Sequence, residues 1–296
     1  SIGSSAFLPL ITVSGGTLHL SNFNVVHKCI EEPTDTIVVN NGGKCNITNV
    51  QFQGENSTFC LLQHSEVSIG KCRLIGGSTA ISVSNSSTLK LTDTVISAFT
   101  HVGVNIISGA SANIQKSTVS CCGQHAILSH NGAQRVELIH SKIISNSNCQ
   151  EGHVPAVQLS AGKQNLIRHC EILKNGGPGI RITHGSECAI EDSIFKQNPI
   201  AINVIGRSRC SIIRCRMVEV SVGLDILHNQ NGQVFMKDNT IKPSIAEVMM
   251  LSSDSIPTMV GRLHKVKLRD DVSSKHIRTP RLETLQKVVA PKKFVR

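Results

Sequence analysis

The most regular feature of the chain is a pair of apolar residues five positions apart, which returns every 22 to 29 residues. Gly, Asn and Ser separate the short apolar runs, which is typical of strands joined by turns and not of helices. The first members of the pairs are Leu20, Ile47, Ile69, Leu91, Ile114, Leu138, Ile167, Ile190, Ile212 and Met236. Their partners are Val25, Phe52, Leu74, Ile96, Val119, Ile143, Ile172, Phe195, Met217 and Ile241.

A second short alternating run follows each pair, so every repeat reads as two or three strands. Examples are Ile81 with Val83, Ile180 with Ile182, and Leu224 with Ile226. No single repeat can bury its own apolar side chains, so stacking of repeats must supply the core. The pattern therefore predicts an all-β fold, a right-handed single-stranded parallel β-helix of about ten coils.

The boundaries of the repeats divide the chain into three parts. We expect an N-terminal lead-in or incomplete coil over residues 1–16, the β-helix over 17–251 and a basic extension over 252–296. Thr279 and Pro280 resemble a helix start, which predicts a short helix in the extension. The chain starts without Met and without signal-peptide regions, so we expect Ser1 to be a fragment boundary with further sequence upstream.

Small residues occupy the position three after most first members, which indicates a tight bend there. The position before it is polar and often charged, and equivalent residues should stack at the strand spacing of about 4.8 Å. We therefore expect two outward ladders of alternating charge, in which each carboxylate has a basic neighbour. The ladders are Lys71, Asp93 and Lys116, and Asp192, Arg214 and Asp238.

The positive charge is concentrated at the C-terminal end. Residues 262–296 hold eleven Lys and Arg against three Asp and Glu, which is +8 of the formal net charge of +10. This extension either caps the last coil or binds an acidic partner. No motif or aromatic pattern indicates specific nucleic-acid binding, and no apolar run is long enough to span a membrane.

The eleven cysteines follow no spaced framework, and several stand at the small bend position. This favours reduced, buried thiols and a cytoplasmic protein over a secreted disulfide scaffold. Cys188 and Cys210 are equivalent in adjacent coils, so the spacing would permit a bridge between them.

No constellation of residues predicts catalysis. Glycoside hydrolysis needs two nearby carboxylates, and the acids of the repeats lie in charge ladders or alone. The segment from Gly179 to Gly185 superficially resembles polygalacturonase elements, but the acidic motifs are absent and His184 is interpreted as a turn residue, like His64, His130 and His228. We therefore expect no enzyme, no catalytic residue, no cofactor and no metal. The chain has no Trp and no Tyr, which weakens the prediction of an extended glycan site.

The longest repeat contains an inserted loop from Ser145 to Pro155, and insertions in repeat proteins often mark the binding face. Cys149, Glu151 and His153 alternate in it, but three ligands in one loop do not predict a metal site. We expect a protein partner to contact this loop, neighbouring outward residues and the extension. The expected contact residues are Lys142, Asn148, Glu151, His153, His169, Glu171, Arg214, Lys292 and Lys293.

Coils such as Ile69-Gly-Lys-Cys-Arg-Leu74 and Ile167-Arg-His-Cys-Glu-Ile172 resemble the parallel β-helix repeats of eukaryotic proteins. With their cysteines and basic extension, they are similar to the C-terminal region of the Shc-binding protein and Nessun Dorma family. That resemblance implies a cytoplasmic scaffold of cytokinesis at the midbody or spindle, which binds centralspindlin. It also implies weak affinity for galactose-containing glycans.

Three functions follow from these observations. The first is a non-enzymatic protein-interaction scaffold. The second is a carbohydrate-binding or polysaccharide-degrading β-helix protein, which a groove containing two close acids would favour. The third is the substrate-recognition domain of an F-box-type ubiquitin ligase, which would require an F-box upstream of Ser1.

Overall fold

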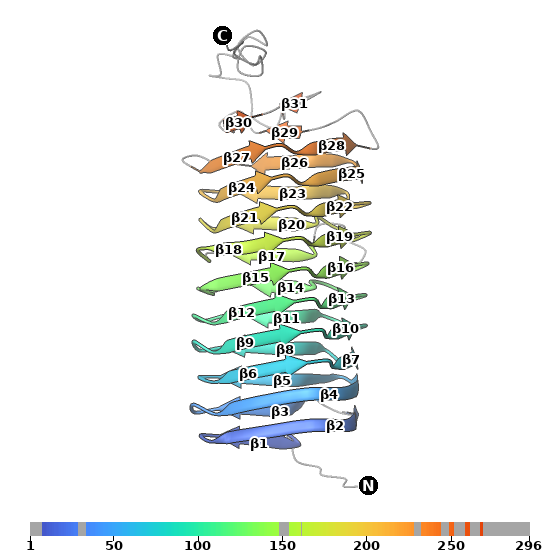
Figure 1. Ribbon diagram of the computed structural model, residues 1–296, viewed down its shortest axis with the longest axis vertical. Helices are drawn as coiled ribbons and strands as arrows, with labels where there is room; N and C mark the ends of the chain where they lie inside the picture. Colours follow the sequence, from blue (N-terminus) through green and yellow to red (C-terminus); the bar gives the residue numbers. More distant parts are fainter. Residues whose placement is uncertain are drawn as a thin grey trace, which may run out of the picture.

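A computed structural model describes residues 8–28, 34–147, 154–160, 162–227, 232–243, 249–251, 258–260 and 267–268. These residues form parallel strands stacked in coils, with no helix in the described part (Figure 1). The strands build two hydrogen-bonded sheets, here called sheet A and sheet B, with 12 and 19 strands. The chain is therefore a parallel β-helix, as the repeat predicts.

Sheet A takes one strand from each coil. Its strands, in spatial order, are β1 (Ile11–Ser14), β3 (Thr34–Asn40), β5 (Ser57–Gln63), β8 (Thr79–Ser84), β11 (Val102–Ile106), β14 (Ile127–Ser129), β17 (Val157–Ser160), β20 (Ile180–Thr183), β23 (Ile200–Ile205), β26 (Val222–Leu227), β29 (Met249–Leu251) and β31 (Lys267–Leu268).

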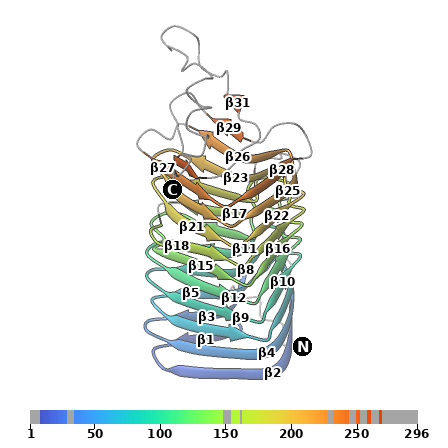
Figure 2. The same cartoon turned by 45° about the horizontal axis from the view of Figure 1, so that its top comes forward.

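Sheet B is bent, and most coils contribute one strand on each side of the bend, as Figure 2 shows. The two long strands β2 (Thr17–Lys28) and β4 (Lys44–Glu55) run across the bend. The first leg then contains β6 (Glu66–Gly70), β9 (Thr88–Thr92), β12 (Ser111–Gln115), β15 (Arg135–Ile139), β18 (Asn165–Arg168), β21 (Glu187–Glu191), β24 (Arg209–Ile213), β27 (Gln233–Lys237) and β30 (Thr258–Val260). The second leg contains β7 (Arg73–Gly76), β10 (Val95–Ser97), β13 (Thr118–Ser120), β16 (Lys142–Ile144), β19 (Glu171–Leu173), β22 (Ile194–Lys196), β25 (Arg216–Val220) and β28 (Thr240–Pro243).

The predicted register is confirmed across the described coils. The first members of the apolar pairs are aligned from Leu20 to Met236, and their partners are aligned from Val25 to Ile241. Between Ile47 and Met217, every one of these side chains is at most 1% exposed. Each coil thus places its apolar pair directly on that of the next coil, which is how a thin repeat gains a continuous core.

The bend of sheet B has a left-handed backbone in ten successive coils, from Asn22 to Asp238. The residue two after each first member has a φ between 47° and 60°. Only glycine adopts this region freely, although Asn and Asp tolerate it better than other residues. The residues concerned are Asn22, Asn49, Lys71, Asp93, Lys116, His140, His169, Asp192, Arg214 and Asp238.

The small residue after the bend carries a hydrogen-bond acceptor for the coil before it. The Oγ of Ser117 accepts from the backbone N–H of Thr94 at 3.2 Å, and Ser141 Oγ accepts from Ser117 N–H at 3.1 Å. The amide of Asn239 does the same for Cys215 at 2.8 Å. Small size is therefore only part of the requirement, because a backbone N–H buried at the bend also needs a partner.

A ladder of asparagines supports the second corner, between sheet B and sheet A. The Asn146 N–H donates to Asn175 Oδ1 at 2.9 Å, and the Asn175 N–H donates to Asn198 Oδ1 at 3.1 Å. All three side chains are at most 3% exposed. The stacked amides satisfy one another and the corner backbone, so the long coil keeps the same corner as its neighbours.

Several expectations fall on residues outside the described part. They include the helix at Thr279 and the alternation of Cys149, Glu151 and His153. Of the extension expected over residues 252–296, only β30 and β31 are described, so its role as a cap stays a prediction.

Candidate functional site

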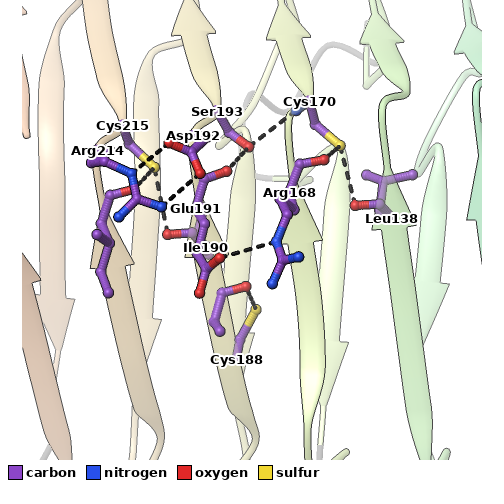
Figure 3. Close-up of polar contacts among 12 residues, drawn as sticks. Leu138, Arg168, Cys170, Cys188, Ile190, Glu191, Asp192, Ser193, Arg214 and Cys215 are labelled. Atoms are coloured by element: carbon purple, nitrogen blue, oxygen red, sulfur yellow. Dashed lines mark hydrogen bonds and ion pairs between the residues drawn. The ribbon is translucent and has the colours of Figure 1, made fainter.

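The outward residues expected to contact a partner lie together at the bend of sheet B. Lys142 Nζ pairs with Glu171 Oε2 at 3.0 Å across adjacent coils. The ring of His169 stacks on that of His140, with centroids 4.7 Å apart and planes 12° apart. Arg214 donates two hydrogen bonds of 2.7 Å to the carboxylate of Asp192 (Figure 3). We call Lys142, His169, Glu171 and Arg214 the bend ridge.

The ion pair between Arg214 of the ridge and Asp192 holds both side chains in their charged forms. The hydrogen bonds from Arg214 lower the pKa of Asp192, and the same contacts raise the pKa of Arg214. Both groups are exposed to solvent, so the pair fixes geometry more than it stabilises the fold. In the other predicted ladder, Asp93 stacks between Lys71 and Lys116, but the described coils show no ion pair within 4.0 Å for it.

The remaining expected contact residues lie outside the described residues. They are Asn148, Glu151 and His153 in the inserted loop, and Lys292 and Lys293 in the extension. No observation brings them to the bend ridge, and their role stays a prediction.

A second polar cluster lies on the outer face of sheet A, where sequence reasoning did not place one. Gln158 in β17 aligns with Arg181 in β20, which aligns with Asn203 in β23 and then Asp225 in β26. The residues that flank Arg181, Ile180 and Ile182, are 0% exposed and point into the core. Since side chains alternate along a strand, this polar row faces outward.

The next two residues of the row, Asn203 and Asp225, hold the side chain of Arg181 in place. Its Nε donates to Asn203 Oδ1 at 2.9 Å, and Asn203 Nδ2 donates to Asp225 Oδ2 at 2.9 Å. Asn203 and Asp225 are 2% and 1% exposed, whereas Arg181 is half-buried. Partial burial lowers the pKa of Arg181 and Asp225 opposes that shift, but the guanidinium is charged at any physiological pH.

Two histidines complete this cluster. His125 Nδ1 lies 2.7 Å from the carbonyl oxygen of Pro155, and His130 Nε2 lies 3.2 Å from Asn105 Oδ1. Burial lowers the pKa of His125, and the charges of Arg181 and His130 lower it further, although the bond to Pro155 opposes them. We call Asn105, His125, His130, Gln158 and Arg181 the sheet A cluster.

The sheet A cluster was missed because its members come from four coils. Asn105, His130, Gln158 and Arg181 lie in or just after β11, β14, β17 and β20, and no local motif joins them. His130 is the first residue of a turn, as expected, because its carbonyl oxygen accepts from the Ala133 N–H at 3.2 Å. Its ring also contacts Asn105 in β11, which the sequence did not indicate. His184 also lies in a turn, with a φ of 54°, as predicted. The cluster becomes visible only when β14 is aligned with β17, and this alignment must cross the inserted loop of the longest repeat.

The chemistry available in the sheet A cluster is hydrogen bonding, fixed positive charge and proton exchange. Amides and imidazoles both donate and accept hydrogen bonds, and a guanidinium donates several. Within the described ranges, no group of three His, Cys, Asp or Glu could hold a metal ion. The cluster therefore has the side chains of a polar-ligand site, with one permanent cation.

The described cysteines are nine free thiols, of which only Cys121 is exposed. Burial raises the pKa of Cys170 to about 11 and that of Cys122 to about 12, so these thiols stay protonated. Cys188 and Cys210 are aligned in adjacent strands and are both free. Buried, protonated thiols are poor nucleophiles, so this set is structural.

No helix among the described residues is long and apolar enough to span a bilayer.

Comparison with known proteins identifies the repeat. The family model described as right handed beta helix region matches residues 11–152 and 130–217. No curated protein sequence matches the chain. The resemblance to the Shc-binding protein and Nessun Dorma family, and a eukaryotic origin, therefore stay predictions.

Among solved structures, the chain is similar to the A-module of mannuronan C-5 epimerase AlgE4 from Azotobacter vinelandii. They are 11% identical, with a TM-score of 0.49, over 83% of this chain and 91% of that one. The enzymatically active domain of tailspike protein 2 from bacteriophage CBA120 is 12% identical, with a TM-score of 0.47, over 81% of this chain and 43% of that one. Pectate lyase Pel9A is 10% identical, with a TM-score of 0.31, over 89% of this chain and 69% of that one.

These three proteins are enzymes by name, which contradicts our expectation that the chain is not an enzyme, and we withdraw that expectation. The expectation rested on the lack of two close carboxylates, and that pair is a requirement of glycoside hydrolysis alone. At 12% identity or less and TM-scores below 0.5, these likenesses assign no reaction to the chain. From the family match over most of its described coils, the chain belongs to the right-handed β-helix family.

Proposed function

We propose that this β-helix protein binds carbohydrate through the sheet A cluster. The observation that carries the proposal is the outward polar row of sheet A, in which Gln158 and Arg181 are half-buried and aligned. On the same outward row, Val38, Leu61 and Leu128 are aliphatic, and Leu128 separates Asn105 from Gln158. The uninterrupted polar run therefore starts at Gln158 and continues through Arg181, Asn203 and Asp225.

The side chains of the cluster match the chemistry of a sugar. Each sugar hydroxyl both donates and accepts a hydrogen bond, as the amide of Gln158 and the imidazole of His130 also do. Partial burial strengthens such bonds relative to fully hydrated groups. The strand spacing of about 4.8 Å sets these groups in a line, which suits a linear chain of residues.

The ladder of Asn203 and Asp225 prepares the site for binding. It fixes the guanidinium of Arg181 before a ligand arrives, so little side-chain entropy is lost on binding. The chain has no Trp and no Tyr to serve as a stacking platform. Affinity must therefore come from hydrogen bonds and charge, and we expect a short oligosaccharide with few contacting units.

Glycan-array binding tests this function, followed by titration of the oligosaccharide that binds best. Arg181→Gln should weaken that affinity about tenfold or more, because one charge-assisted hydrogen bond contributes about 1.5–3 kcal/mol. Arg73→Gln, the same change at an exposed arginine of β7, is the matched control and should bind normally. The array ligand is also incubated with the protein to detect new reducing ends or unsaturated products.

Absence of any retained glycan would overturn the carbohydrate proposal. Equal loss of affinity in Arg181→Gln and Arg73→Gln would overturn the assignment to sheet A, since only Arg181 belongs to the cluster. Turnover of a bound glycan would support the carbohydrate function and add an enzymatic activity to it.

The bend ridge supports a second function, protein binding by a scaffold. Lys142, Glu171 and Ile194 are aligned on one outer row, and Ile194 is 38% exposed. The ridge therefore offers a protein partner both charged groups and one apolar side chain to contact. The family resemblance supplies the partner to test, centralspindlin, and a cytoplasmic location at the midbody or spindle.

Direct binding to purified centralspindlin tests this second function. Lys142→Glu combined with Arg214→Glu should weaken binding about tenfold, because like charges would then meet a surface selected for the opposite sign. Lys90→Glu on β9 is the control at an exposed lysine away from the ridge. Unchanged affinity in the double variant would exclude the bend ridge as the contact face.

A further inference from the structure

Two exposed histidines lie side by side at the bend of sheet B, away from the sheet A cluster. His140 and His169 occupy the same bend position in adjacent coils, because the residues before and after them are in register. Their rings stack with centroids 4.7 Å apart and planes 12° apart. Both side chains are exposed, so solvent and dissolved ions reach the ring nitrogens.

The backbone under the two rings is held by bonds between coils. The N–H of His140 donates to the carbonyl oxygen of Arg168 at 3.0 Å, and the N–H of His169 donates to that of Glu191 at 3.2 Å. Both histidines have a left-handed backbone, with φ of 49° and 54°. The two Cα atoms are thus kept at the strand spacing of about 4.8 Å, whereas the exposed rings can turn about their side-chain bonds.

The spacing of the two rings suits bonds from both to one metal ion. A bond from zinc to an imidazole nitrogen is about 2.0–2.1 Å long, so two nitrogens on one ion lie at most about 4.2 Å apart. Rings with centroids 4.7 Å apart reach that separation by rotation of the side chains, without movement of the backbone. Imidazole is a ligand that Zn²⁺, Cu²⁺ and Ni²⁺ all accept.

We propose that His140 and His169 bind one divalent transition-metal ion at the bend of sheet B, each through one ring nitrogen. No third His, Cys, Asp or Glu joins them within the described ranges, so water fills the remaining positions of the ion. A structural zinc site is closed by four protein ligands, whereas this site is open to solvent. The ion can therefore take a further ligand from outside the chain.

The acidic residues on either side of His169 are already in ion pairs. Asp192, at the next bend position, accepts two hydrogen bonds of 2.7 Å from Arg214 (Figure 3). Glu171 pairs with Lys142 at 3.0 Å. The imidazoles are thus the groups available to an ion, and we expect Mg²⁺ and Ca²⁺, which prefer oxygen ligands, not to bind there.

Calorimetric titration of the tag-free protein with Ni²⁺ tests the site, because this ion binds imidazole and does not oxidise thiols. We expect one ion per chain at the bend and no response to Mg²⁺. His140→Asn and His169→Asn should each weaken binding about tenfold or more, because a single imidazole cannot chelate. Asn fits the bend, since Asn22 and Asn49 occupy the same position in earlier coils.

His64→Asn is the matched control. His64 is exposed and has a φ of 50°, but its neighbours at the same turn are Asn41 and Asn85. This variant should bind Ni²⁺ normally. The double variant of His140 and His169 should bind little more weakly than either single variant, because two chelating ligands act as one unit.

NMR of the unchanged protein locates the ion without any substitution. Ni²⁺ is paramagnetic, so the amide signals around His140 and His169 should broaden before all others. Broadening centred elsewhere would overturn the proposal, as would full affinity in either single variant or no binding of Ni²⁺. Two independent ions, each lost with one histidine, would also exclude a shared site. None of these results bears on the carbohydrate function, which lies on sheet A.

Discussion

At the residue scale, the bend of sheet B depends on two neighbouring positions. The first has left-handed backbone in the coils from Asn22 to Asp238, and the second supplies a hydrogen-bond acceptor to the coil before it. Asp93, Asp192 and Asp238 at the first position are a recognisable signal of a left-handed turn, although their charges led us to interpret them as ion-pair ladders. The sequence did not reveal the acceptor role of the second position. Cys, Ser, Thr and Asn are all small and can all accept a hydrogen bond, so the pattern was interpreted by size alone.

Ser117→Ala should destabilise the fold by about 1–3 kcal/mol, since the buried N–H of Thr94 would lose its partner. Urea unfolding followed by circular dichroism measures the difference. Ser97→Ala, in β10 and half-buried, removes the same hydroxyl away from the bend and should cost less than about 0.5 kcal/mol. Equal effects of the two changes would show that the acceptor ladder does not stabilise the bend.

At the element scale, the strands and their register were predictable and the corners were not. Aligned apolar pairs are visible in the sequence because every coil repeats the same burial. The asparagine ladder lies three residues after the second apolar partner, at Asn146, Asn175 and Asn198. That spacing was present in the sequence, but Asn is also common in ordinary turns, so its burial could not be inferred.

Asn175→Ala should destabilise the protein by about 2–4 kcal/mol, because it leaves several buried groups of the corner without partners. The free energy of unfolding from denaturant titration measures this loss. The matched change is Asn24→Ala, at an exposed position of β2, which should have little effect. A loss below about 0.5 kcal/mol in Asn175→Ala would contradict a structural role for the ladder.

At the scale of the whole molecule, the fold follows from the repeat, but the site does not. Stacking brings residues far apart in the sequence, such as Asn105 and His130, within hydrogen-bond distance. A repeat pattern makes residue types visible when they return at the same position of successive coils. The members of the sheet A cluster differ in type from coil to coil, so the pattern does not mark them. The function was therefore placed on the bend ridge, where charges do recur.

The reactivity of the cysteine thiols shows whether the stacked coils stay closed in the native protein. In the native protein, Cys121→Ser should remove one rapidly reacting thiol, because Cys121 is exposed. Cys188→Ser should remove none, since burial raises the pKa of Cys188 far above its usual range and shields the sulfur. Reaction with a chromogenic disulfide reagent, before and after denaturation, counts these thiols. Loss of a fast-reacting thiol in Cys188→Ser would show that the coils open readily.

The most direct test of the central claim is NMR mapping of backbone amides as the oligosaccharide that binds best on the array is added. We predict that the shifted amides cluster in β14, β17 and β20, around His130, Gln158 and Arg181, and that sheet B stays unchanged. Shifts confined to sheet B and the bend ridge, or no saturable shifts with any sugar, would contradict the assignment of the carbohydrate site to sheet A.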